Sequence, residues 1–99
     1  MAGYVIAIVD VTDAEAYKEY ARQVPATIAK YGGRYLVRTG TSDVREGEWP
    51  GTRTVILEFP SLARALEWYD SAEYRPLRPM RQANAHARIA FFDGVSPER

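Results

Sequence analysis

Two oppositely charged side chains, Arg38 and Glu58, each stand inside an apolar run of the sequence. A charge in such a run needs an ionic partner or must border a cavity that holds a ligand. One interpretation is a structural ion pair between neighbouring strands. In the other, the Arg38 guanidinium binds an anionic or carbonyl oxygen, while Glu58 orients it or accepts a proton. The second interpretation predicts that both side chains point into one concave space.

His86 is the only histidine, and the chain has no cysteine. These counts exclude disulfides, thiolate metal sites and metal sites built from two histidines. Because imidazole titrates near neutral pH, His86 is an alternative general base at a cavity rim. The competing interpretation is an exposed histidine at the edge of a strand. We take Glu58 and His86 as the candidate catalytic residues and expect neither a metal nor a cofactor.

Most of the tyrosines and tryptophans recur at helical spacing, an arrangement that usually marks the hydrophobic core. Alternatively, some of them line a pocket between helices and sheet, where their polar groups orient a small ligand. Tyr35, Trp68 and Tyr74 are the candidate walls of such a pocket, beside Arg38.

Runs rich in β-branched residues, interrupted by glycine and proline, predict four strands. They cover residues 4–9, 34–39, 53–59 and 87–92. The stretch 40–51 holds three glycines, a proline and four charged residues, which predicts a loop or an irregular hairpin.

Apolar residues spaced three and four apart predict a first helix between a Thr12-x-x-Glu15 capping box and Gly32. Pro25 lies inside this helix and should kink or split it in the preceding turn, because it lacks the N–H group. A second helical region begins after the N-cap Ser61 and is made irregular by two further prolines.

The resulting βαββαβ order predicts an α+β fold with a four-stranded antiparallel sheet and both helices on one face. Residues 4–9 are apolar at every position, so neither face of this strand suits water. A bare apolar sheet face is an association site, and pairing two copies about a two-fold axis covers it. The pattern therefore predicts a homodimer with a sheet-to-sheet contact.

The length and net charge of the chain limit how many domains it can form and which partners it can bind. Ninety-nine residues suffice for one domain, expected over residues 1–99 with a polar tail at 96–99. Thirteen basic and thirteen acidic side chains cancel, whereas binders of nucleic acid or anionic membranes normally carry a basic excess. The opening residues lack the basic region of a signal peptide. We therefore expect a cytoplasmic protein that binds neither nucleic acid nor membrane.

Several motifs resemble those of one known family. They are Tyr31-Gly-Gly-Arg-Tyr-Leu-Val-Arg38, Glu46-Gly-Glu-Trp49, Val55-Ile-Leu-Glu-Phe-Pro-Ser61 and Trp68-Tyr-Asp-Ser-Ala-Glu-Tyr74. Together with the first strand and the segment Asp10-Val-Thr-Asp-Ala-Glu-Ala-Tyr17 that follows it, they resemble the "domain of unknown function 1330" family over nearly the whole chain. Membership implies the dimeric α+β barrel superfamily, in which ferredoxin-like subunits pair through their sheets. The resemblance leaves the biochemical role open.

Three functions compete. The first is a small-molecule enzyme without a cofactor, for which Arg38, Glu58 and His86 are the available groups. The second is a non-catalytic ligand-binding or regulatory dimer with the same cavity. The third is RNA recognition, since RRM domains share this element order, but residues 53–59 lack the required aromatic run. The sequence favours a dimer that binds a small molecule and leaves open whether it is an enzyme.

Overall fold

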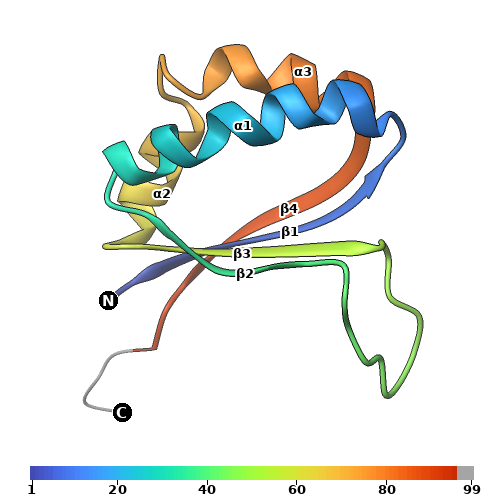
Figure 1. Ribbon diagram of the computed structural model, residues 1–99. Helices are drawn as coiled ribbons and strands as arrows, with labels where there is room; N and C mark the ends of the chain where they lie inside the picture. Colours follow the sequence, from blue (N-terminus) through green and yellow to red (C-terminus); the bar gives the residue numbers. More distant parts are fainter. Residues whose placement is uncertain (96–99) are drawn as a thin grey trace.

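The computed structural model describes residues 1–95, and the polar tail expected at residues 96–99 lies outside them. Four strands, three α-helices and a short 3₁₀ helix follow one another along the chain (Figure 1). Their order is β1 (Gly3–Val11), α1 (Ala14–Lys30), β2 (Arg34–Thr39), β3 (Arg53–Phe59), α2 (Leu62–Tyr69), η1 (Arg75–Leu77), α3 (Arg78–Asn84) and β4 (Ala85–Asp93). The sheet is antiparallel throughout, in the order β2-β3-β1-β4. The predicted ferredoxin-like fold is therefore confirmed.

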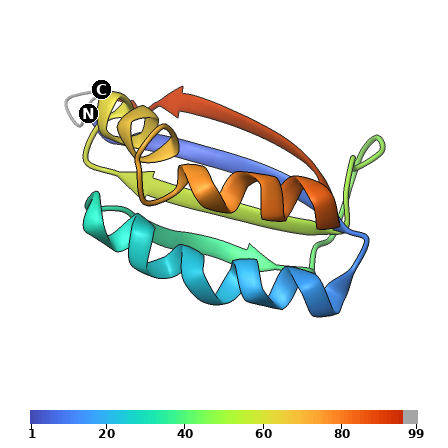
Figure 2. The same ribbon diagram turned by 90° about the horizontal axis from the view of Figure 1, so that it is seen from above.

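The helices all lie on one face of the sheet. Seen from above, α1 runs along the β2 side, α3 runs beside it, and α2 lies toward β1 and β4 (Figure 2). No helix within residues 1–95 is long and apolar enough to cross a membrane.

The first helix differs from expectation at its start and in its middle. Its N-cap is Asp13, whose Oδ1 accepts from the Ala16 N–H at 3.1 Å, so the capping box predicted at Thr12 is wrong. The expectation that Pro25 splits the helix is also wrong, because α1 continues through it. Solvent can reach the carbonyl that Pro25 leaves free, since Ala21 is exposed. The predicted end is confirmed, with Gly32 at φ +80° in the left-handed region that favours glycine.

The second helical region is segmented as the prolines suggested. Ser61 caps α2 by accepting from the Arg64 N–H at 3.0 Å. After α2 ends, the Ser71 hydroxyl accepts from the Tyr74 N–H at 3.1 Å and turns the chain toward η1 and α3. Because of this break, residues of α2 and of α3 face the same part of the sheet.

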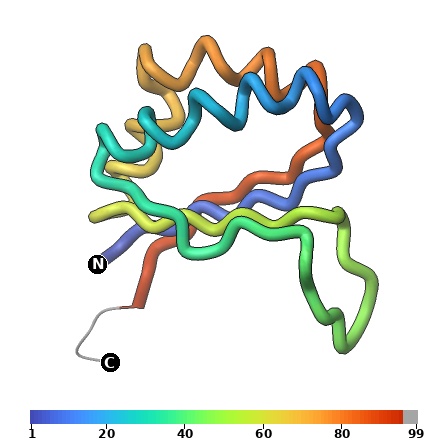
Figure 3. The backbone as a smooth tube through the Cα atoms, viewed as in Figure 1, coloured from blue at the N-terminus to red at the C-terminus, as the bar shows by residue number. Residues whose placement is uncertain are grey.

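The register divides the sheet residues into two faces. Val5 pairs with Leu57 on one side and Phe91 on the other, and this face lies under the helices. Ile6 pairs with Ile56 and Ala90 on the opposite face, which no helix of residues 1–95 covers (Figure 1). The loop between β2 and β3 hangs below the sheet on this uncovered side (Figure 3). The sheet therefore has one face without helices, and the centre of that face is apolar.

A bulge in β2 changes which residues face the helices. Tyr35 pairs with Leu57 and Arg38 pairs with Val55, while the register shifts between Tyr35 and Val37. The extra residue is Leu36, and without it residues three apart would point to opposite faces. Tyr35 and Arg38 consequently lie on the same, helix-covered face.

Candidate functional site

A cavity of about 80 Å³ lies between the sheet and the helices. Most of its wall is apolar, and Arg38, Arg53 and Arg81 lie among the lining residues together with five tyrosines and Trp68. A single water molecule needs roughly 10–15 Å³ of such space. The cavity therefore suits a molecule of about six water-sized groups or slightly more. The cavity is therefore sized for a small organic molecule.

A chain of polar contacts closes one wall of the cavity. The Tyr20 and Tyr74 hydroxyl oxygens lie 2.7 Å apart and share a hydrogen bond. The Tyr74 oxygen also accepts from Nη1 of Arg81 at 3.1 Å. These side chains come from α1, from the turn after α2 and from α3, so the segmented second helical region is what brings them together. Arg81 is only 6% exposed.

The cavity is lined by positive charges alone. It is lined by three arginines, and no aspartate or glutamate is among its lining residues. Arg38, Arg53 and Arg81 form no salt bridge with any residue of the described chain. The Arg38 guanidinium carbon lies 4.3 Å from the centre of the Tyr35 ring, a cation–π contact that leaves its charge uncompensated.

Burial controls the ionisation of the cavity tyrosines. It raises the pKa of Tyr17, Tyr20, Tyr35 and Tyr74, so their hydroxyls remain neutral hydrogen-bond donors at neutral pH. Tyr69 differs: burial opposes its ionisation, but the guanidinium groups of Arg81 and Arg78 outweigh this and lower its pKa.

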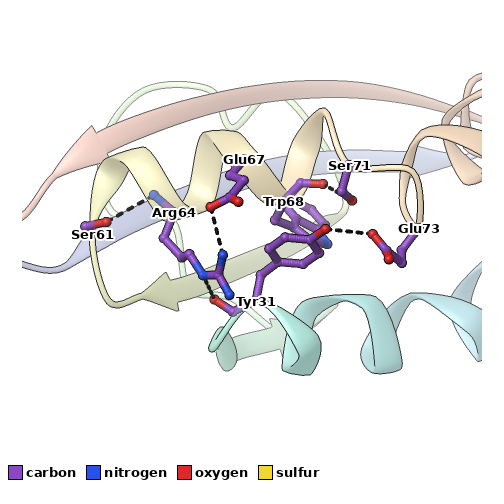
Figure 4. A network of polar contacts seen from close by, with 7 residues as sticks. All are labelled: Tyr31, Ser61, Arg64, Glu67, Trp68, Ser71 and Glu73. Atoms are coloured by element: carbon purple, nitrogen blue, oxygen red, sulfur yellow. Dashed lines mark hydrogen bonds and ion pairs between the residues drawn. The ribbon is translucent and has the colours of Figure 1, made fainter.

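Trp68 is fixed in the wall by both aromatic and polar contacts. Its ring centre lies 4.2 Å from that of Tyr74, and its indole N–H donates to the Thr27 hydroxyl at 3.0 Å. The helix that carries it is fastened to the end of α1, since the Arg64 Nε donates to the Tyr31 carbonyl at 3.1 Å (Figure 4). The Tyr31 hydroxyl in turn donates to Glu73 at 2.7 Å. These bonds hold the Trp68 ring against the cavity.

The four candidate ligand-binding residues meet at one place. Arg38, Tyr35, Trp68 and Tyr74 all line the cavity. Tyr74 is 1% exposed and Trp68 3% exposed, so both also belong to the hydrophobic core. Their part in binding remains a prediction.

Glu58 is not in this cavity, and the expected shared space with Arg38 is wrong. It pairs with Tyr4 and Arg34 on the uncovered face, because it follows Leu57 in a strand without a bulge. Its carboxylate accepts from the Tyr4 hydroxyl at 2.9 Å and lies 2.7 Å from Nη2 of Arg34. The Arg34 and Tyr4 hydrogen bonds lower its pKa, so it stays ionised in a structural ion pair.

His86 also lies apart from the cavity. It is exposed at the start of β4, opposite Asp10 in the register. Together with Asp10 and Gln82 it lines a separate shallow groove. The expectation of a base at the rim of the ligand cavity is therefore wrong, and the alternative of an exposed strand-edge histidine describes its position.

Arg53 and Arg81 were missed by the sequence reasoning, although a signal for each exists. Arg53 lies on the same face of β3 as Val55 and Leu57. Strict alternation along this strand would have placed all three residues under the helices. Arg81 follows Leu77 by four residues, so helical spacing puts both on the buried side. Within residues 1–95 no cluster of three or more His, Cys, Asp or Glu side chains could hold a metal ion.

The family model described as "Domain of unknown function (DUF1330)" matches residues 2–95. No curated protein matches the chain in sequence.

Among solved structures, the RPA0582 protein of unknown function from Rhodopseudomonas palustris aligns with a TM-score of 0.77 at 21% identity, covering 97% of this chain and 84% of that one. A variant of SnoaB, a cofactor-independent oxygenase from Streptomyces nogalater, aligns with a TM-score of 0.66 at 15% identity, covering 96% and 94%. Rv0793 from Mycobacterium tuberculosis aligns with a TM-score of 0.62 at 17% identity, covering both chains completely. These similarities show that the chain shares its α+β fold with these proteins.

Proposed function

This chain belongs to the DUF1330 family, and on that premise we propose that it is a homodimer whose subunits each bind a small organic molecule in the cavity under the helices. The observation that carries the proposal is the wall of that cavity. It combines apolar side chains with hydrogen-bonded tyrosines and a buried arginine, the composition typical of small-molecule sites.

The uncovered face of the sheet supports the dimer. Ile6 lies beside Ile56 and Ala90 near the middle of this face. Leu36 and Phe92 are exposed large apolar side chains of the outer strands, at 44% and 47%. Two copies related by a two-fold axis cover these residues, and a specific interface of this kind buries about 1,200–2,000 Å² in total.

The test of binding is a screen of small organic molecules against the purified protein. A ligand that binds only the folded state stabilises it by about 2.7 kcal/mol at a concentration one hundred times its Kd. For a domain of this size each kcal/mol raises Tm by about 4–8 °C. We expect such rises for molecules that fit the cavity, and a screen in which no molecule raises Tm contradicts the proposal.

A second candidate function is catalysis without a cofactor, and Tyr69 is the observation that favours it. Tyr69 is one of the residues that line the cavity, and the Arg78 guanidinium carbon lies 4.6 Å from its ring centre. A tyrosine with a lowered pKa can accept a proton from a bound substrate. SnoaB, which shares the fold, is a cofactor-independent oxygenase.

This candidate predicts that Tyr69 ionises before the other tyrosines. In an ultraviolet titration of the folded protein, the first tyrosinate signal should rise below the usual pKa of about 10. The Tyr69→Phe variant should lose this first step, because the group that carries it is gone. The Tyr20→Phe variant should retain it, since burial raises the pKa of Tyr20. An unchanged first step in Tyr69→Phe rules out Tyr69 as the base.

A further inference from the structure

Arg81 is a buried cation without a counterion. It is 6% exposed, and its Nη1 donates to the Tyr74 hydroxyl at 3.1 Å. Its Nε–H is buried and has no hydrogen-bond partner among the described residues. Guanidinium groups remain charged in proteins, and a buried charge is normally paired with an opposite one. No carboxylate lines the cavity to fill that role.

The two other arginines that line the cavity also lack a carboxylate partner. Arg38 and Arg53 line the same space and form no salt bridge within the described chain. Seven other basic side chains do pair with acids, and all seven lie outside the cavity lining. Five basic side chains of residues 1–95 form no salt bridge, and three of them line this cavity, the other two being Arg75 and Arg88.

We infer that the ligand of the cavity is a small carboxylic acid with an apolar body, bound as its carboxylate by Arg81. This inference rests on the proposed function and names its ligand class. The planar guanidinium fork matches the two oxygens of a carboxylate. Because the Tyr20 and Tyr74 hydroxyls share one hydrogen bond, one of their two hydroxyl hydrogens is left to donate to a ligand oxygen.

The size and the remaining wall favour a carboxylate over a phosphate ester. About 80 Å³ holds roughly six water-sized groups, so an apolar body has more room beside a carboxylate than beside a bulkier phosphate. Much of the wall is apolar, including Val5, Val24 and Leu57, and would contact the body of the acid. Arg38 is exposed and Arg53 partly exposed, so both lie where solvent reaches the cavity and raise the local concentration of anions.

The test compares acids with their neutral amides by calorimetric titration. The probes are benzoate with benzamide, phenylacetate with phenylacetamide, and hexanoate with hexanamide. A hydrogen-bonded charge pair predicts that a carboxylate binds about ten to one hundred times more tightly than its amide. The Arg81→Met variant should remove this preference while leaving the affinity for the amide within about threefold.

A matched control removes the same charge elsewhere. Arg75 is exposed and donates to the Asp70 carbonyl at 2.8 Å, outside the cavity. Arg75→Met should keep the full preference for carboxylates, and circular dichroism should show both variants folded.

Three results overturn the inference. If amides bind as tightly as the acids, the ligand class is wrong while the proposed function stands. The same holds if Arg81→Met and Arg75→Met lose the preference equally, because a general effect of net charge then explains it. If neither member of any pair binds, the inference fails, whereas the proposed function is judged by the thermal screen.

Discussion

Replacing Ile6 by glutamate is expected to convert the homodimer into folded monomers. Ile6 lies on β1, an interior strand of the sheet, and its neighbours on the uncovered face are Ile56 and Ala90. A two-fold contact would bury the new carboxylate of both subunits against apolar surface, and unpaired buried charges cost several kcal/mol each. The dimer Kd should therefore rise by about a thousandfold or more. Light scattering after size exclusion measures the change at micromolar concentration.

The control places the same charge on a helix. Ala29 is exposed on α1, so Ala29→Glu should leave the mass at twice the 11.2 kDa of the chain. Circular dichroism should show both variants folded, since Ile6 does not belong to the buried core under the helices. A dimer that survives Ile6→Glu, or a wild-type protein that runs as a monomer, contradicts the proposed interface.

Filling the cavity is expected to abolish ligand binding without removing a polar group. Ala7 lines the cavity from the middle of β1, where a phenyl ring would occupy much of the roughly 80 Å³. Molecules that raise Tm of the wild-type protein should therefore leave Ala7→Phe unchanged. Overpacking itself costs about 1–3 kcal/mol, so Tm of the unliganded variant should fall. Thermal unfolding with and without each ligand separates the two effects.

The same substitution on the surface is the control. Ala26 is exposed on α1 and does not line the cavity, so Ala26→Phe should keep the full rise of Tm with each ligand. If Ala7→Phe also keeps that rise, the molecules bind outside the cavity.

The fold could be predicted because its signals are local and repeated. The first strand is a run of six apolar residues, Gly32 ends a helix through its left-handed backbone, and Ser61 begins one through its hydroxyl. The helix start was predicted one residue too early, at the Thr12 capping box, although Asp13 is also a good cap. In the structure the Thr12 and Asp13 N–H groups both donate to the Asn84 carbonyl, at 2.8 and 3.2 Å, and the Asp13 carboxylate caps the helix.

The candidate site could be predicted only in part, because side-chain direction depends on register. Arg38 and Glu58 are both charges within apolar runs, and the sequence does not reveal the bulge that turns Arg38 toward the helices. Glu58 keeps the ordinary alternation of β3 and points the other way. Arg81 was missed for a different reason: its helix has only seven residues, with Pro76 just before it and Pro79 in its first turn, so the apolar stripe around Arg81 spans barely two turns.

The most direct test of the cavity as the ligand site is a ¹⁵N-correlated NMR titration of the wild-type protein with phenylacetate and phenylacetamide. The chain has two tryptophans, and their indole N–H signals report from different places. Trp68 lines the cavity, whereas Trp49 is 49% exposed in the loop below the sheet. We expect the Trp68 indole signal to shift together with the amides of Val5 and Ala7, while the Trp49 signal stays in place. Shifts confined to Trp49 or His86, or no shift with either probe, would contradict the account.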